Sequence, residues 1–364
     1  MIETSTSPYK RLSETLNKIP HGFPKAKDGI THLKVLMWIF SEDEADFVSK
    51  MKLMGETVEE LSTRLDIPIN GLNQKLEKMV NRGLIQAINT STGRRYALMP
   101  FIGGIYEEQL NRMDSEFAQL MKEYLEQFQE GHIFDTKPAF FRIIPIDKVI
   151  RPELIIHPFE QAKYIVEQSK SWGIRECICK EQQALLGNPC KYPKTVCLNF
   201  SKKEKAFDNH SITRPITKEQ ALIYLQEAEE AGLIHNSMNV QSGHYMLCNC
   251  CTCCCGILQA VSKWKYPLAY VKSNFQINVN SELCKGCEIC VDRCQFDALK
   301  VIQDVCSINL DRCVGCGVCA ITCPEEALSL VARKSPEQSP PPETLRDWMA
   351  QKAMSQNIDP SDLL

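Results

Sequence analysis

The sequence predicts a multidomain protein of the α+β class, and three observations support this prediction. Residues 30–104 combine apolar residues at helical spacing with a turn-rich segment between two short extended runs. Cysteines crowd into the second half of the chain. One cysteine motif occurs twice near the C-terminal end, with Cys313 repeating Cys284. We therefore expect helices and a hairpin first, then a cysteine-rich middle domain, and finally a small duplicated domain.

The composition points to metal binding. The chain has 364 residues, 19 cysteines and a formal net charge of −3. Such a weak charge does not indicate wholesale binding to nucleic acid or to an anionic membrane. Adjacent cysteines rarely fit a disulfide framework, because their side chains point apart. Crowded cysteines in a long chain therefore favour metal ligation in a reducing compartment.

The N-terminal sequence predicts neither export nor membrane insertion. It lacks a basic stretch followed by an apolar one, and no apolar run is long enough to cross a bilayer. We expect a cytoplasmic protein. The crowding of metal-binding cysteines further suggests an anaerobic or microaerobic cell.

Residues 30–104 are expected to form one helical domain with a hairpin. Thr57, with Glu60 three residues later, has the pattern of a capping box and opens the second helix. A third helix should cover residues 70–82 and end at Gly83. The turn residues 89–94, between two extended runs, then predict a hairpin.

This order of elements resembles a winged helix-turn-helix domain. The resemblance implies that the third helix enters the major groove of DNA and that the hairpin tip contacts phosphates. The basic residues at those positions are Lys75, Lys78, Arg82, Arg94 and Arg95. Nearby acidic residues, among them Glu60 and Glu77, nearly offset their charge. DNA binding is therefore possible but not favoured, and the alternative is a protein-docking module.

Two further segments lead to the cysteines. Residues 105–135 contain an apolar stripe that predicts one long amphipathic helix over residues 107–129, which is suited to forming a homodimer. Residues 136–270 are expected to form a cysteine-rich α/β middle domain. Within it, Thr217 opens a helix that Gly232 ends.

The middle domain contains a possible third metal site. Its cysteines are Cys177, Cys179, Cys190, Cys197, Cys248, Cys250, Cys251, Cys253, Cys254 and Cys255. Four of them would suit a further iron–sulfur cluster, and all of them would suit two clusters or one larger cluster. Tetrahedral zinc fits four thiolates equally well, and a redox-active thiol pair is another alternative. The arrangement resembles multidomain ferredoxin-like iron–sulfur proteins of anaerobes, for which a reaction is seldom known.

The duplicated motif near the C-terminal end predicts two [4Fe–4S] clusters. Cys284 and Cys313 each begin a copy of C-x2-C-x2-C-x3-C, and four thiolates are what each cluster needs. Residues 276–332 resemble the two-cluster bacterial ferredoxin family. The resemblance assigns Cys284, Cys287, Cys290 and Cys323 to cluster 1. It assigns Cys313, Cys316, Cys319 and Cys294 to cluster 2.

The first copy of the motif departs from the family at one position. Gln295 stands where that family usually has a proline after the fourth cysteine. This difference affects local rigidity and not ligation. Cys306 lies outside the motif, and we expect it to be a buried apolar cysteine.

The two ends of the chain are the least patterned parts. Residues 1–29 are polar, contain prolines and are expected to form a lead segment. Residues 333–364 are expected to form a proline-rich linker and a C-terminal helix.

The favoured function is iron–sulfur electron transfer, either as a carrier or as a subunit of an oxidoreductase. Two [4Fe–4S] clusters, and a further Fe–S cluster or zinc in the middle domain, would pass low-potential electrons to or from a redox partner protein. A first alternative is a redox-sensing transcription regulator with a winged-helix reader. A second is an oxidoreductase whose active site is the middle cysteine cluster.

Overall fold

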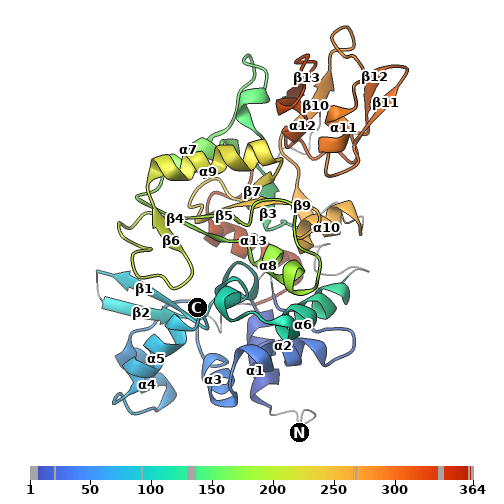
Figure 1. The fold of residues 1–364 in the computed structure, drawn as a ribbon. Coiled ribbons are helices and arrows are strands. Elements are labelled where there is room, and N and C mark those ends of the chain that lie inside the picture. The colour runs from blue at the N-terminus through green and yellow to red at the C-terminus, as the bar shows by residue number, and fades with distance from the viewer. Residues whose placement is uncertain are drawn as a thin grey trace. The chain divides into compact units, whose positions relative to one another are not determined.

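The chain consists of two compact units, described here from a computed structural model (Figure 1). The structure describes residues 7–19, 22–91, 93–128, 137–264, 266, 269–334, 340–359 and 361. The first unit covers residues 1–133 and 349–364, and the second covers residues 134–348. The mixture of helices and several small sheets confirms the α+β class. Among the described residues, no helix is both long and apolar enough to span a membrane.

The first unit is mainly helical. Its helices are α1 (Pro8–Asn17), α2 (Thr31–Ile39), α3 (Glu42–Val48), α4 (Val58–Leu65), α5 (Leu72–Asn81) and α6 (Ser115–Glu126). Strands β1 (Gln86–Thr90) and β2 (Gly93–Ala97) form an antiparallel hairpin. Aromatic rings fill part of the core, where Phe23 packs against Phe101 and Tyr124.

Local sequence signals explain where several of these elements start and stop. The Thr57 hydroxyl accepts the N–H of Glu60 while the Glu60 carboxylate accepts the N–H of Thr57, so α4 begins with the expected capping box. Gly83 has a φ of 66°, which suits the residue that follows the end of α5. The predicted helices and hairpin of this segment are thus present.

The long helix predicted over residues 107–129 is divided in the structure. A 3-10 helix, η2, covers Glu107–Arg112, and α6 begins only at Ser115. Asp114 causes the break, because its side chain accepts the N–H of Phe117 at 2.8 Å and caps a new helix. The apolar stripe is buried inside the first unit through Phe117 and Met121. Residue 129 lies outside the described residues.

The second unit is built on a seven-stranded mixed sheet in the order β6-β4-β5-β8-β7-β3-β9. The strands are β3 (Phe141–Ile143), β4 (Ser171–Glu176), β5 (Thr195–Ser201), β6 (Arg214–Ile216), β7 (Ile234–Met238), β8 (Met246–Cys250) and β9 (Tyr270–Val271). Helices α7 (Ala162–Glu167) and α9 (Lys218–Ala231) cover the sheet (Figure 1). Helix α9 begins at the capping box of Thr217 and Gln220 and ends at Gly232, as expected.

Two short helices start at cysteines beside this sheet. Helix α8 (Ile178–Leu185) follows Cys177, and α10 (Gly256–Ser262) follows Cys255. The cysteine-rich segments therefore lie where strands β4 and β8 pass into helices.

The last part of the second unit repeats a strand, loop, helix and strand. Strands β10 (Phe275–Val279) and β13 (Leu328–Ala332) pair, as do β11 (Leu299–Ile302) and β12 (Val305–Ile308). Helices α11 (Ile289–Arg293) and α12 (Val318–Ile321) follow equivalent loops. The C-terminal helix α13 (Leu345–Gln356) is present as predicted, and the indole of Trp348 donates to the Ala139 carbonyl at 3.0 Å.

Candidate metal centres

The first cysteine loop of the duplicated region encloses a small cavity together with a cysteine of the second copy. Cys284, Cys287 and Cys290 line it from the loop and from the start of α11, and Cys323 lines it from the end of α12. The structure therefore brings together the quartet that the family resemblance implies for cluster 1. Cys287 is exposed, so this cavity lies close to solvent.

The second quartet is more deeply buried. Cys294, at the end of α11, acts electrostatically on Cys313, Cys316 and Cys319. Burial, together with negative charge on Cys294 and Cys313, raises the pKa of Cys316 to about 12. Thiolates gathered in such a place need a compensating cation, which a metal cluster provides.

Residues with positive φ let both loops close tightly. Gly317 and Glu288 occupy equivalent positions before α12 and α11, with φ of 83° and 64°. A Cβ on Gly315 would collide with the carbonyl oxygen of Phe275, and one on Gly286 would collide with the backbone of Asp304. The loops can therefore approach neighbouring backbone only because these glycines lack side chains.

Cys306 lies beside the first quartet, closer to it than the sequence suggested. It is buried as expected, but its sulfur is 3.6 Å from that of Cys290. Its backbone N–H also donates to the Cys284 sulfur at 3.4 Å. Burial raises the pKa of Cys306 to about 12, so it remains a protonated thiol at neutral pH. The sequence placed Cys306 outside the motif and did not indicate this contact.

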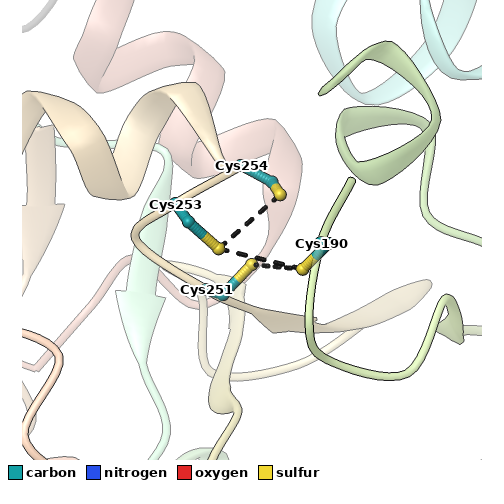
Figure 2. Close-up of side chains that lie close together, drawn as sticks. All are labelled: Cys190, Cys251, Cys253 and Cys254. Atoms are coloured by element: carbon teal, nitrogen blue, oxygen red, sulfur yellow. Dashed lines mark hydrogen bonds between the residues drawn. The ribbon is translucent and has the colours of Figure 1, made fainter. Parts of the chain in front are cut away.

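Four of the ten middle cysteines form a compact group, the tetrad of Cys190, Cys251, Cys253 and Cys254 (Figure 2). Cys190 comes from the loop between α8 and β5, and the others come from the turn between β8 and α10. All four sulfurs lie within 4.8 Å of one another. Hydrogen bonds with Cys251 and Cys254 lower the pKa of Cys253, which favours its thiolate.

The spacing of the tetrad suits a single tetrahedral ion. The sulfur of Cys190 is 3.6 Å from that of Cys251 and 3.8 Å from that of Cys253. The sulfurs of Cys253 and Cys254 are 3.7 Å apart. A zinc ion with Zn–S bonds of about 2.3 Å needs sulfurs about 3.8 Å apart at the corners of a tetrahedron. The donors and distances therefore fit zinc.

The other six middle cysteines lie outside the tetrad. They are Cys177, Cys179, Cys197, Cys248, Cys250 and Cys255. Residue order does not separate them from the tetrad, because members of the two sets are neighbours in the chain. Cys248 and Cys250 belong to strand β8, whereas Cys251, Cys253 and Cys254 belong to the turn that follows it.

A side-chain bridge connects the tetrad turn with the second quartet. The Gln295 side-chain oxygen accepts the backbone N–H of Thr252 at 2.8 Å, and its nitrogen donates to the carbonyl of Gly232. Gln295 directly follows Cys294, and Thr252 lies between Cys251 and Cys253. The residue that departs from the ferredoxin family thus links two cysteine groups.

The basic residues considered for nucleic-acid binding mostly face intramolecular partners. Arg94 pairs with Glu77 at 2.6 Å and Arg95 with Glu60 at 2.6 Å, while Arg82 pairs with Glu44. The ammonium group of Lys75 lies 4.6 Å from the centre of the Phe47 ring. Lys78 is exposed on α5. The charge available for phosphates is therefore smaller than the count of basic residues suggests.

Comparisons with known proteins match one part of the chain. The 4Fe-4S binding domain family matches residues 277–300 and 307–329. Neither the curated proteins nor the solved structures gave a match. Residues 277–329 therefore form a 4Fe-4S binding domain, and the chain is an iron–sulfur protein with a second cysteine-rich region outside that domain.

Proposed function

We propose that the protein transfers low-potential electrons through two [4Fe–4S] clusters to or from a partner oxidoreductase. The observation that carries this proposal is the cavity lined by Cys284, Cys287, Cys290 and Cys323. Three thiolates from one loop and one from the other copy are the ligand arrangement of two-cluster ferredoxins. Cys294 supplies the reciprocal fourth ligand to the loop of Cys313.

The surroundings of the two quartets support a direction for the electron path. The carbonyl of Cys316 accepts the N–H of Ile146, so the second loop lies against the middle domain. Cys287 is instead exposed, and the neighbouring Leu283 and Ile289 are 44% and 43% exposed. Exposed apolar side chains beside a cluster suit a transient redox contact. Cluster 1 would thus exchange electrons with the partner and cluster 2 with the middle domain.

The tetrad would hold the further metal of the middle domain. Its spacing favours zinc over a third cubane, because four sulfurs around a cubane must leave room for inorganic sulfide and several irons. Zinc would then fasten the turn that Gln295 contacts. The proposed domain layout keeps residues 30–104 as a winged-helix-like docking module and residues 276–332 as the electron-transfer module.

Metal analysis of matched variants tests the function. The anaerobically purified chain should hold about eight irons in these two clusters, with an EPR-active reduced state at about −400 mV. Cys287→Ser should damage cluster 1 and Cys316→Ser cluster 2, and each should lose about half of those irons. Cys306→Ser should lose none. Full retention of iron in both ligand variants would contradict the assignment.

A further inference from the structure

The six middle cysteines outside the tetrad share one place in the fold. On adjacent antiparallel strands, Cys197 of β5 lies directly opposite Cys248 of β8. Cys250 is two residues further along β8 and points to the same face as Cys248. Side chains of these three residues therefore gather on one face of the sheet.

The starts of two helices bring the other three cysteines to the same place. Cys177 is the residue before α8, and Cys179 lies in the first turn of that helix. Cys255 is the residue before α10. Backbone N–H groups at the start of a helix favour negative charge nearby. The start of α8 therefore favours a thiolate at Cys177.

The six side chains form a closed ring of interactions. Cys177 interacts with Cys179 and Cys197, and Cys248 interacts with Cys197 and Cys250. Cys255 closes the ring through Cys179 and Cys250. Each of these six cysteines therefore has two partners among the six. The sulfurs of the tetrad instead form hydrogen bonds with other tetrad members. The ten cysteines thus divide into two sets by their interaction partners, and members of both sets pack in one buried cluster.

The ring is more open than the tetrad. Within the described part of the chain, the tetrad is the one group of three or more possible metal-ligating side chains whose ligand atoms all lie within 4.8 Å of one another. The ring does not meet this condition, and neither do the quartets of the 4Fe-4S binding domain. A single ion would leave an open ring underfilled, whereas an inorganic iron–sulfide core occupies such a space.

Groups beside the ring suit an anionic centre. Lys180 is 2% exposed, its ammonium group donates to the carbonyl of Pro193, and its charge acts on Cys177. The Tyr270 hydroxyl interacts with the Cys255 sulfur, and Tyr270 is only 4% exposed. A buried cation and a hydroxyl donor are typical neighbours that stabilise metal-bound thiolates. Packing alone would not require either of them.

We propose that Cys177, Cys179, Cys197, Cys248, Cys250 and Cys255 form one thiolate site that holds an iron–sulfur cluster larger than a cubane. A cubane uses four thiolates, and the closed ring gives no reason to leave two members out. This inference rests on the proposed electron-transfer function and adds a centre on the middle-domain side of cluster 2.

Iron, sulfide and zinc should be measured on the full chain, purified without oxygen. The wild type should hold more than about twelve irons, because the two cubanes account for about eight, and one zinc. Cys197→Ser and Cys248→Ser should each lower the iron to about eight without loss of zinc. Cys253→Ser should lose the zinc and keep the iron, and Cys306→Ser should keep both.

Retained zinc in the ring variants shows that the neighbouring turn has folded. Mössbauer spectra of the iron-57-labelled wild type provide a measurement that needs no variant, and should show an iron environment distinct from the cubanes. Unchanged iron and sulfide in both ring variants would overturn the proposal. A wild type with about twelve irons would also overturn it, because that count indicates a third cubane. A Cys197–Cys248 disulfide found by thiol alkylation would overturn it as well.

Failure of the ring and failure of the function give different results. If the ring holds no iron, Cys287→Ser and Cys316→Ser still lose their irons, and the electron-transfer function stands. If those two variants lose nothing, the function itself fails, whatever the ring contains.

Discussion

The side-chain oxygen of Gln295 accepts the backbone N–H of Thr252 at 2.8 Å. This bond joins the residue after Cys294 to the turn that contains Cys251 and Cys253. Nearby, Arg293 donates to the carbonyl of Glu229 at 3.0 Å at the end of α9. Helix α11 is therefore fixed to the middle domain on the side of the second quartet.

Gln295→Ala should weaken this attachment. The variant leaves the half-buried Thr252 N–H without its acceptor, which costs about 1–3 kcal/mol. The midpoint of thermal unfolding should fall, while the iron content of the 4Fe-4S binding domain remains. Gln226→Ala, on the exposed face of α9, is the control and should change little. Equal stability of both variants would show that the bridge does not contribute.

Cys306→Ala should shift one cluster potential in the negative direction. The Cys306 and Cys290 sulfurs lie 3.6 Å apart. Burial raises the pKa of Cys290, and the protonated Cys306 thiol opposes this rise, which means that it stabilises negative charge there. Losing a weak donor worth about 1 kcal/mol corresponds to roughly 40 mV for one electron. Redox titration followed by EPR measures the shift. Cys306→Ser, which keeps a donor, should recover part of it, and an unchanged potential in the alanine variant would contradict the prediction.

Glu160→Gln should destabilise the second unit strongly. Glu160 is fully buried, pairs with the buried Arg142 at 3.2 Å, and accepts the Asn274 N–H at 2.8 Å. Removing its charge leaves a buried guanidinium without its counter-ion, at a cost of about 3–5 kcal/mol. Chemical denaturation measures the change in the free energy of unfolding.

Glu167→Gln is the matched control for that variant. Glu167 pairs with Lys163 on the surface of α7 at 3.9 Å. An exposed pair of this kind contributes less than about 1 kcal/mol. Similar losses for Glu160→Gln and Glu167→Gln would refute the central role of the buried pair.

Mild acid should destabilise the protein through His244. Burial lowers its pKa to about 4, aided by the positive charge of Arg142, whereas the unfolded chain has an ordinary value near 6.5. Below that value the unfolded state binds a proton that the folded state does not. The free energy of unfolding should therefore fall by about 1 kcal/mol between pH 7.5 and 5.5.

His244→Gln removes this titration, so the difference between its stability and that of the wild type should shrink or reverse as the pH falls. The exposed His157→Gln serves as control and should follow the wild type. Parallel pH profiles for the wild type and His244→Gln would argue against the assignment.

The helices and hairpin of residues 30–104 should bind DNA poorly. Arg94 and Arg95 are paired with Glu77 and Glu60, so few charges are available for phosphates. Fluorescence anisotropy with a short duplex should give a dissociation constant weaker than about 10⁻⁴ M at physiological salt. The double variant Glu60→Gln and Glu77→Gln releases both arginines and should bind more tightly. Tight, salt-dependent binding by the wild type would instead support the transcription regulator.

The sequence predicted most reliably what depends on neighbouring residues. The capping boxes at Thr57 and Thr217, the glycine ends of α5 and α9 and the duplicated cysteine loops are all present. The break at Asp114 was missed because the apolar stripe continues through it, and only the cap shows that a new helix begins there.

The division of the ten middle cysteines was not predictable from their order. Cys250 and Cys251 are adjacent in the chain yet belong to the ring and to the tetrad. Their grouping depends on which sulfur atoms the tertiary fold brings close together, and residue order does not show this. The bridge from Gln295 was hidden for the same reason, since the sequence marked that residue only as a missing proline.

The cavity that Cys323 shares with the first cysteine loop also bears on biosynthesis. The polypeptide must be made as far as residue 323 before the first loop has its fourth thiol, because Cys323 lies beyond the whole first copy of the motif. A cluster in that cavity is therefore completed only once both copies of the motif exist and have folded together. Any truncated product that ends between the two copies would expose reactive thiols instead of forming half of an electron carrier.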